Sequence, residues 1–205
     1  KIAAWKLGGT NQKTQDVFKV SEAYYGPIFE SEMATVEGLG KFPDLGSLEG
    51  EAELALRLTS FGADRKNSES TNPNLIFDQW AVAIEFPYCV FSDIPDAGVA
   101  ALVADRCGAG ALVLGQAQNG LPPDEFLVTI DLDGVVASSG TQDAMLLHPI
   151  AAGLEFRELA FTHGSKLEAG QWVSTGGLTS CLRFKSEDEL TLKLNGNVIF
   201  TLRNE

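Results

Sequence analysis

The sequence predicts an α+β fold built around a mixed or antiparallel sheet. Segments with the pattern of strands outnumber segments with the pattern of helices, and hairpin signals recur. Two pairs of strand-like segments are joined by Asx-Gly turns, which favour type I′ hairpins: residues 126–132 and 135–136 around Asp133-Gly134, and residues 190–194 and 197–202 around Asn195-Gly196. A chain of 205 residues is long enough for one domain with a sizeable core.

The first part of the chain is expected to hold a buried strand, followed by loops and a turn. Residues 2–7 are apolar apart from Lys6, and Gly8-Gly9 ends this strand. A lysine in an apolar strand is unfavourable unless its ammonium group reaches an anion or water, so Lys6 needs such a partner or extends to the surface. The next segments are predicted as a polar loop at 10–19, a turn at 24–27 leading into 28–33, and a loop at 38–46.

The clearest strand pattern covers residues 48–58, where apolar residues alternate with Glu49, Glu51 and Glu53. A strand sends alternate side chains to opposite faces, so the leucines would face a core and the glutamates a common cleft. Glu51 and Glu53 would lie roughly 6–7 Å apart and repel each other. A hard divalent cation with a preference for oxygen ligands would relieve that repulsion. The alternative is a solvated edge strand with a charged outer face.

A further acidic residue, Glu85, interrupts the apolar strand predicted over residues 80–87. A lone carboxylate in such a strand needs a partner, which could be a cation, Lys6 or backbone donors. If this strand lies beside residues 48–58, Glu51, Glu53 and Glu85 form a three-carboxylate site.

The remaining elements alternate between helices and strands. A helix is predicted over residues 92–108, and Asp105 in its last turn opposes the helix dipole, so we expect Asp105 to have a specific partner. A second helix is predicted over 140–163, with Pro149 near its start or kinking it. The other predictions are a surface loop and candidate for disorder at 62–74, a buried strand at 109–115, a turn at 167–170 and a strand at 171–175.

Composition limits the class of protein. The net charge of −13 argues against nucleic acid and anionic membranes as partners, and it favours binding of a cation. The three cysteines are widely spaced and odd in number, which indicates reduced thiols in a cytoplasmic protein. No apolar run is long enough to cross a bilayer, and no signal peptide is recognisable.

Several stretches, in order along almost the whole chain, resemble the 2-keto-4-pentenoate hydratase / 4-oxalocrotonate decarboxylase branch of the fumarylacetoacetate hydrolase superfamily. The stretches that carry this resemblance are Trp5-Lys6-Leu7-Gly8-Gly9-Thr10, Glu51-Ala52-Glu53-Leu54-Ala55-Leu56, Ala83-Ile84-Glu85, Ala104-Asp105, Val113-Leu114-Gly115, His148-Pro149-Ile150, Leu167-Glu168-Ala169-Gly170 and Thr175-Gly176-Gly177-Leu178-Thr179. The resemblance implies a β-rich roll, in which a twisted mixed sheet is flanked by peripheral helices. It also implies that residues 1–205 are a single domain of this superfamily that lacks an N-terminal helical segment.

The resemblance further implies a site and its ligands. Glu51, Glu53 and Glu85 correspond to the ligands of Mg²⁺ or Mn²⁺, and Lys6 corresponds to an active-site lysine. The positions implied to bind substrate are Lys6, Leu7, Gly8, Asp105, Thr175 and Gly176. The implied activity is that of a metal-dependent lyase in aromatic catabolism. Its substrate is a small 2-oxo acid, and the protein is expected to be a homo-oligomer.

The sequence also departs from this family pattern. Tyr24-Tyr25-Gly26 stands where the hydratases usually carry an acidic residue used in proton transfer, so Glu22 or Tyr24 would have to act in its place. Arg106 replaces an asparagine, and Gly176-Gly177 replaces Gly-Ser. The metal ligands therefore match the family better than the proton-transfer groups do.

The predicted reaction is hydration or decarboxylation of a 2-oxo acid through an enolate stabilised by the metal. Both reactions use the same metal residues, which therefore cannot separate them. A Lys6 close to a cation would have a lowered pKa, suited to acid–base work. One alternative is a C–C hydrolase, which usually needs a water-activating histidine; His148 and His163 are expected to be structural at helix ends. The other alternative is a non-catalytic relative that binds metal or 2-oxo acid, or that supports an active subunit.

Overall fold

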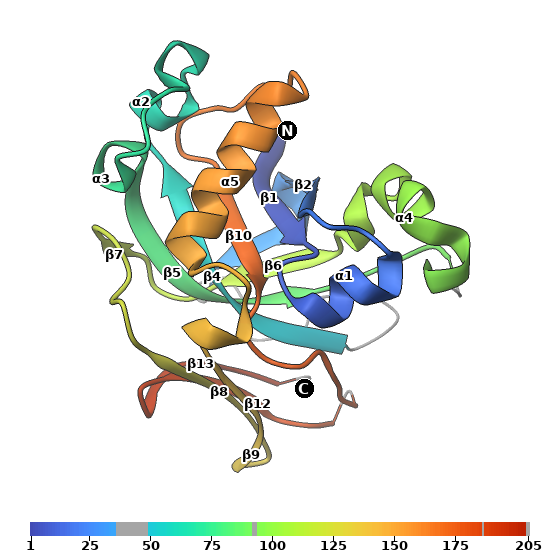
Figure 1. Cartoon of the computed structure of the whole chain (residues 1–205). Coiled ribbons are helices and arrows are strands. Elements are labelled where there is room, and N and C mark those ends of the chain that lie inside the picture. The colour runs from blue at the N-terminus through green and yellow to red at the C-terminus, as the bar shows by residue number, and fades with distance from the viewer. Residues whose placement is uncertain (36–48, 92–93, 186, 204–205) are drawn as a thin grey trace.

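The computed structural model describes residues 1–35, 49–91, 94–185 and 187–203, and these residues form two sheets with helices around them (Figure 1). The strands are β1 (Ile2–Gly8), β2 (Tyr24–Phe29), β3 (Met33–Thr35), β4 (Glu49–Leu58), β5 (Phe77–Phe86), β6 (Ala111–Leu114), β7 (Gln118–Asn119), β8 (Leu127–Leu132), β9 (Val135–Thr141), β10 (Trp172–Gly177), β11 (Leu182–Arg183), β12 (Leu190–Leu194) and β13 (Asn197–Leu202). The α-helices are α1 (Gln12–Phe18), α2 (Ser60–Ala63), α3 (Pro73–Ile76), α4 (Ile94–Ala104) and α5 (Pro149–Thr162). Short 3₁₀ turns are η1 (Glu30–Glu32), η3 (Arg65–Asn67), η4 (Arg106–Gly108) and η5 (Gln142–Ala144).

The larger sheet is mixed, as predicted. Its main strand order is β2-β1-β10-β4-β5-β6-β3, in which β1 pairs with β10 and β3 with β6 in parallel, while the other neighbours are antiparallel. The smaller sheet, in the order β13-β12-β8-β9, consists of the two predicted hairpins. Both residues of each Asx-Gly turn have positive φ, from 50° to 80°, as a type I′ turn requires.

The alternation in β4 matches the prediction for its apolar face. Ala52, Leu54, Leu56 and Leu58 are buried in the main core. The helix α5 lies across this side of the sheet, in contact with β10 and β4 (Figure 1). Gly153 permits the close approach, because a Cβ there would lie 2.8 Å from Leu56 and 3.0 Å from Phe77. The alternative of a solvated edge strand is wrong, since β4 lies between β10 and β5.

Two predictions for residues 1–35 need correction. The supposed loop at 10–19 contains α1, whose N-terminus is capped by Asn11 accepting from the Thr14 amide. The supposed turn at 24–27 is part of β2, where Pro27 is tolerated because β2 ends the main strand order. The predicted loop at 38–46 lies outside the described residues.

The segment at 62–74, predicted as a loop and candidate for disorder, contains short helical turns instead. The buried Arg157 guanidinium of α5 organises it by donating to four backbone carbonyls, those of Gly62, Asn67, Ser68 and Ser70. A single buried side chain therefore holds four backbone carbonyls of this polar segment in place.

The two long predicted helices are shorter in the structure. The helix α5 begins at Pro149, as the proline suggested, and Gly140 belongs to β9. The helix α4 ends at Ala104, is interrupted at Gly98 (φ 80°) and is followed by η4. The backbone of η4 packs closely on β2, because a Cβ at Gly26 would lie 1.9 Å from the Arg106 carbonyl oxygen.

Two further features concern the whole described chain. Cys89, Cys107 and Cys181 are free thiols, as predicted. Within the described ranges, every helix falls short of the length and apolar character needed to cross a membrane.

Candidate metal centre

The register of β4 against β5 brings the three predicted carboxylates together. Glu51 lies directly opposite Glu85, and Glu53 follows two residues along on the same face of β4. One carboxylate oxygen from each of the three residues lies within 4.8 Å of the others. Glu53 and Glu85 are fully buried and Glu51 is partly buried, so the predicted three-carboxylate cluster is present at the centre of the larger sheet.

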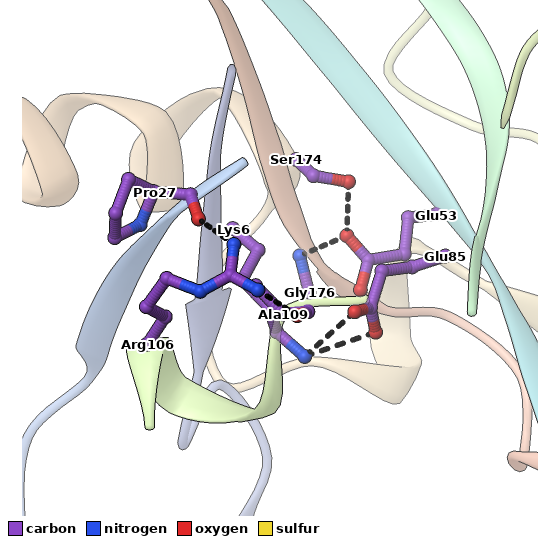
Figure 2. A network of polar contacts seen from close by, with 8 residues as sticks. All are labelled: Lys6, Pro27, Glu53, Glu85, Arg106, Ala109, Ser174 and Gly176. Atoms are coloured by element: carbon purple, nitrogen blue, oxygen red, sulfur yellow. Dashed lines mark hydrogen bonds and ion pairs between the residues drawn. The ribbon is translucent and has the colours of Figure 1, made fainter. Parts of the chain in front are cut away.

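The carboxylate of Glu53 is held by β10 (Figure 2). The hydroxyl of Ser174 and the backbone N–H of Gly176 both donate to its Oε2 atom. The other oxygen, Oε1, is buried and has no hydrogen-bond partner among the described residues. A buried carboxylate oxygen without a donor is energetically costly, so this atom is a candidate ligand for a cation.

Lys6 reaches the same cluster from β1. Its Nζ lies 2.9 Å from both carboxylate oxygens of Glu85, and both residues are almost completely buried (Figure 2). The parallel pairing of β1 with β10 sets this position by placing Lys6 beside Ser174. The expectation that Lys6 finds an anion is therefore confirmed.

The crowding of charged groups in a buried space shifts their pKa values. Burial, together with the neighbouring carboxylates, raises the pKa of Glu51 to about 7 and that of Glu53 to about 8. Burial by itself would lower the pKa of Lys6, but the Glu85, Glu51 and Glu53 carboxylates raise it above its ordinary value. This direction is that of the metal-free chain, and the lowered pKa expected for Lys6 beside a bound cation stays a prediction.

A cleft of about 210 Å³ reaches the cluster at Glu51. Glu51, Lys6, Leu7, Gly8 and Tyr24 are among the residues that line it. A second, larger hollow of about 650 Å³ runs along α1 and shares Glu51 and Gly177 with the first. Glu51 therefore lies where these two hollows meet.

Tyr24, for which the sequence predicted a role in proton transfer, lines this cleft. Its ring packs on Gly8, where a Cβ would lie 2.2 Å from a Tyr24 ring carbon, and it meets Phe18 of α1 edge-on at 6.0 Å. Burial raises the pKa of the Tyr24 phenol above its ordinary value, and the charge of Lys6 opposes this only in part. Tyr24 is therefore protonated at neutral pH and can act as a donor.

Four other predicted site residues lie outside the lining of this cleft in the part of the chain that the structure describes. Glu22 is exposed. Thr175 donates its hydroxyl to the Leu54 carbonyl. Gly176 holds Glu53 through its N–H, and Asp105 lies behind the cleft wall. Their roles in substrate binding stay predictions.

The partner expected for Asp105 is present. Its carboxylate accepts hydrogen bonds from the Val90 amide and the Cys89 thiol, and this fixes the segment that carries Cys89 in the cleft wall. The guanidinium of the neighbouring Arg106 pairs with Glu32. It also donates to the Pro27 and Ala109 carbonyls (Figure 2). Arg106 therefore joins η4 to β2.

Sequence reasoning missed Ser174, Cys89 and Cys107 as parts of the site. Cys89 and Cys107 line the cleft, and burial raises the pKa of the Cys107 thiol to about 12, which makes it a poor nucleophile. Ser174 could have been found by alternation, because Val173 is in the core and a strand sends the next side chain to the opposite face.

The donor set fits a divalent cation. Three converging carboxylates are hard oxygen ligands, and Glu53 Oε1 lacks a donor among the described residues. Glu51, Glu53 and Glu85 would hold such an ion.

Comparison with known proteins identifies the fold. No family model matches the chain. The structure of 4-oxalocrotonate decarboxylase from Pseudomonas putida G7, complexed with magnesium and adipate, matches with a TM-score of 0.79 at 21% sequence identity over 99% of this chain and 78% of that one. A protein from Yersinia pestis CO92, described as of the fumarylacetoacetate hydrolase family, matches with a TM-score of 0.67 at 15% identity over 98% and 92%. The chain has the fold of the fumarylacetoacetate hydrolase family.

This fold confirms the predicted β-rich architecture with peripheral helices. Another protein with the fumarylacetoacetate hydrolase fold is fumarylpyruvate hydrolase from Pseudomonas aeruginosa, in complex with Mn²⁺ and pyruvate, which matches with a TM-score of 0.67 at 11% identity over 98% of this chain and 88% of that one. The P. putida enzyme has also been seen with calcium and acetate. Three of these structures therefore hold a divalent cation.

The raised carboxylate pKa values predict how stability depends on pH. In chelator-treated protein, Glu51 and Glu53 keep protons up to pH values near 7 and 8, whereas an ordinary glutamate with a pKa of 4.5 has lost its proton. The folded chain therefore binds more protons than the unfolded chain between these values, and its stability should fall as the pH rises from about 5 to 8. Urea unfolding at pH 5, 6.5 and 8 measures this, and a rising free energy of unfolding would contradict it.

Proposed function

We propose that this chain is a divalent-metal-dependent lyase acting on a 2-oxo acid. The observation that carries the proposal is the convergence of three carboxylates and Lys6 beside a cleft that Glu51 and Lys6 line. It is supported by the similarity in fold to a decarboxylase that has been seen with magnesium and adipate. A cation held by Glu51, Glu53 and Glu85 would act as a Lewis acid that stabilises negative charge developing on the C2 oxygen of the substrate.

Side chains that line the cleft would bind the substrate, supply a proton and limit the access of water. The Lys6 ammonium group lies on Glu85 and lines the cleft, so it is suited to attract a substrate carboxylate. Tyr24 stays protonated and lines the same cleft, so it can deliver a proton to a carbon atom of the substrate. Leu7 and Leu102 give part of the wall an apolar character that limits access of water.

A C–C hydrolase is the second candidate, because fumarylpyruvate hydrolase shares the fold. The positions of the two histidines favour the lyase. His148 caps the start of α5 by accepting from the Ile150 amide, and His163 stacks on Tyr25 at the end of α5. In the described part of the chain, neither histidine lines the cleft that holds Lys6, so the usual water-activating group of the hydrolases is not in place.

A panel of 2-oxo acids tests the proposal. The purified chain is incubated with Mg²⁺ or Mn²⁺ and with 4-oxalocrotonate, 2-hydroxypenta-2,4-dienoate or fumarylpyruvate. Release of CO₂ from the first or hydration of the second supports the lyase, and formation of fumarate and pyruvate from the third supports the hydrolase. Binding of the metal without turnover of any of these acids would indicate a non-catalytic relative and overturn the proposal.

Loss of the Tyr24 hydroxyl should reduce turnover. We expect Tyr24→Phe to lower kcat by roughly 10²-fold, which is typical for loss of a general acid, while KM and Mn²⁺ affinity change little. Steady-state kinetics measure this. Tyr25→Phe is the matched control, because the Tyr25 hydroxyl contacts Ser165 and His163 rather than the cleft, and its kcat should stay near the wild-type value. Equal kcat values for the two variants would exclude Tyr24 as the proton donor.

A further inference from the structure

The strand β10 contains an irregularity where it passes the carboxylate cluster. Ser174 pairs with Ala55 of β4, but Gly177 pairs with Glu53, so β10 has one extra residue between these two points. This is a β-bulge, and bulges next to active sites commonly redirect a side chain or a backbone group. Here the bulge directs two donors at Glu53, the Ser174 hydroxyl and the Gly176 N–H.

The backbone of the bulge is built for this contact. Gly176 has φ of 111°, which side chains rarely allow, and a Cβ there would lie 2.0 Å from the Thr10 hydroxyl. At Gly177 a Cβ would lie 2.3 Å from a Glu51 carboxylate oxygen. Gly177 therefore allows β10 to lie directly against the Glu51 carboxylate, and Gly176 allows β10 to pass Thr10 while its N–H donates to Glu53.

Ser174 completes the arrangement with a side chain. It is fully buried, and its hydroxyl is used on Glu53 Oε2. The adjacent Thr175 is equally buried but donates to the Leu54 carbonyl, which is an ordinary contact between strands. Because both donors bind the same oxygen of Glu53, the carboxylate cannot rotate freely, and Oε1 is left facing away from them without a donor among the described residues.

We propose that Ser174 is a positioning residue that orients Glu53 so that a divalent cation is bound through Oε1. This inference rests on the proposed metal-dependent function. Groups that hydrogen-bond a metal ligand restrict its orientation, and their removal typically weakens metal binding by about 10- to 100-fold. In Ser174→Ala one of two donors is lost, and Glu53 can turn away from the cluster.

The test measures Mn²⁺ affinity directly, by titration with detection of free Mn²⁺ by electron paramagnetic resonance. Ser174→Ala should raise the dissociation constant by roughly 10-fold or more. If the chain turns over a 2-oxo acid, the Mg²⁺ concentration for half-maximal activity should rise similarly, while kcat at saturating Mg²⁺ stays within about threefold of wild type. Ser174→Thr keeps the hydroxyl and should restore Mn²⁺ affinity, with circular dichroism confirming that each variant folds.

Thr175→Val provides the matched control, because it removes a buried hydroxyl from the same strand that does not contact Glu53. It should lower the free energy of unfolding while leaving Mn²⁺ affinity within about twofold, since no contact to a metal ligand is lost. Equal Mn²⁺ affinity of Ser174→Ala and wild type would overturn the positioning role alone. Failure of the wild-type chain to bind Mn²⁺ would instead overturn the proposed function.

Discussion

Glu53→Gln should lower kcat/KM of the proposed lyase by roughly a thousandfold or more and greatly weaken Mn²⁺ binding, while making the metal-free chain more stable. The amide keeps the shape of the carboxylate, so packing is unchanged. It removes a negative charge from a fully buried position beside Glu51 and Glu85. That charge is unfavourable without a cation, as the raised pKa of Glu53, about 8, indicates.

Glu53→Gln is expected to lower activity and metal binding but to raise the stability of the metal-free chain, so the two effects can be told apart. Chelator-treated Glu53→Gln should melt several degrees above chelator-treated wild type at pH 8, and Mn²⁺ should raise the melting temperature of wild type only. Glu49→Gln is the control, since Glu49 is on the same strand but pairs with the exposed Arg183 at the surface. Full activity of the Glu53→Gln variant would show that the metal centre takes no part in the reaction.

Lys6→Met is expected to destabilise the chain by about 3–5 kcal/mol, because it leaves the buried Glu85 carboxylate without its partner. Both Glu85 oxygens depend on the Lys6 ammonium, and Glu85 is fully buried. Activity should also be lost, since the cleft loses its positive charge. Chemical unfolding in the presence of a chelator measures the first effect, and steady-state kinetics with Mg²⁺ measure the second.

A double variant separates stability from function. Lys6→Met combined with Glu85→Gln removes both charges and should recover most of the stability without recovering activity. Lys193→Met is the matched control, because Lys193 pairs with the buried Asp131 in the smaller sheet. It should destabilise the chain while Mn²⁺ affinity stays at the wild-type value. If Lys6→Met were as stable as wild type, the buried ion pair would not be the contact that the structure indicates.

Short-range signals were sufficient for several elements. Asp133-Gly134 and Asn195-Gly196 predicted their hairpins because type I′ turns need residues that tolerate positive φ. The alternation in β4 predicted its core face because a strand has only two faces. The helix α1 was missed because it has no buried residue and therefore no apolar stripe in its sequence. The prediction for 62–74 failed because Arg157 from a distant helix holds this segment.

The sequence alone determined which groups had to find partners, because a lysine or a glutamate in an apolar strand cannot be buried without one. Only the tertiary structure decided which partners they have. Lys6 and Glu85 are 79 residues apart, and Ser174 and Glu53 are 121 apart. Their contacts depend on the strand order β1-β10-β4-β5 and on one extra residue in β10, and both are set by long-range pairing that leaves no pattern in any single segment.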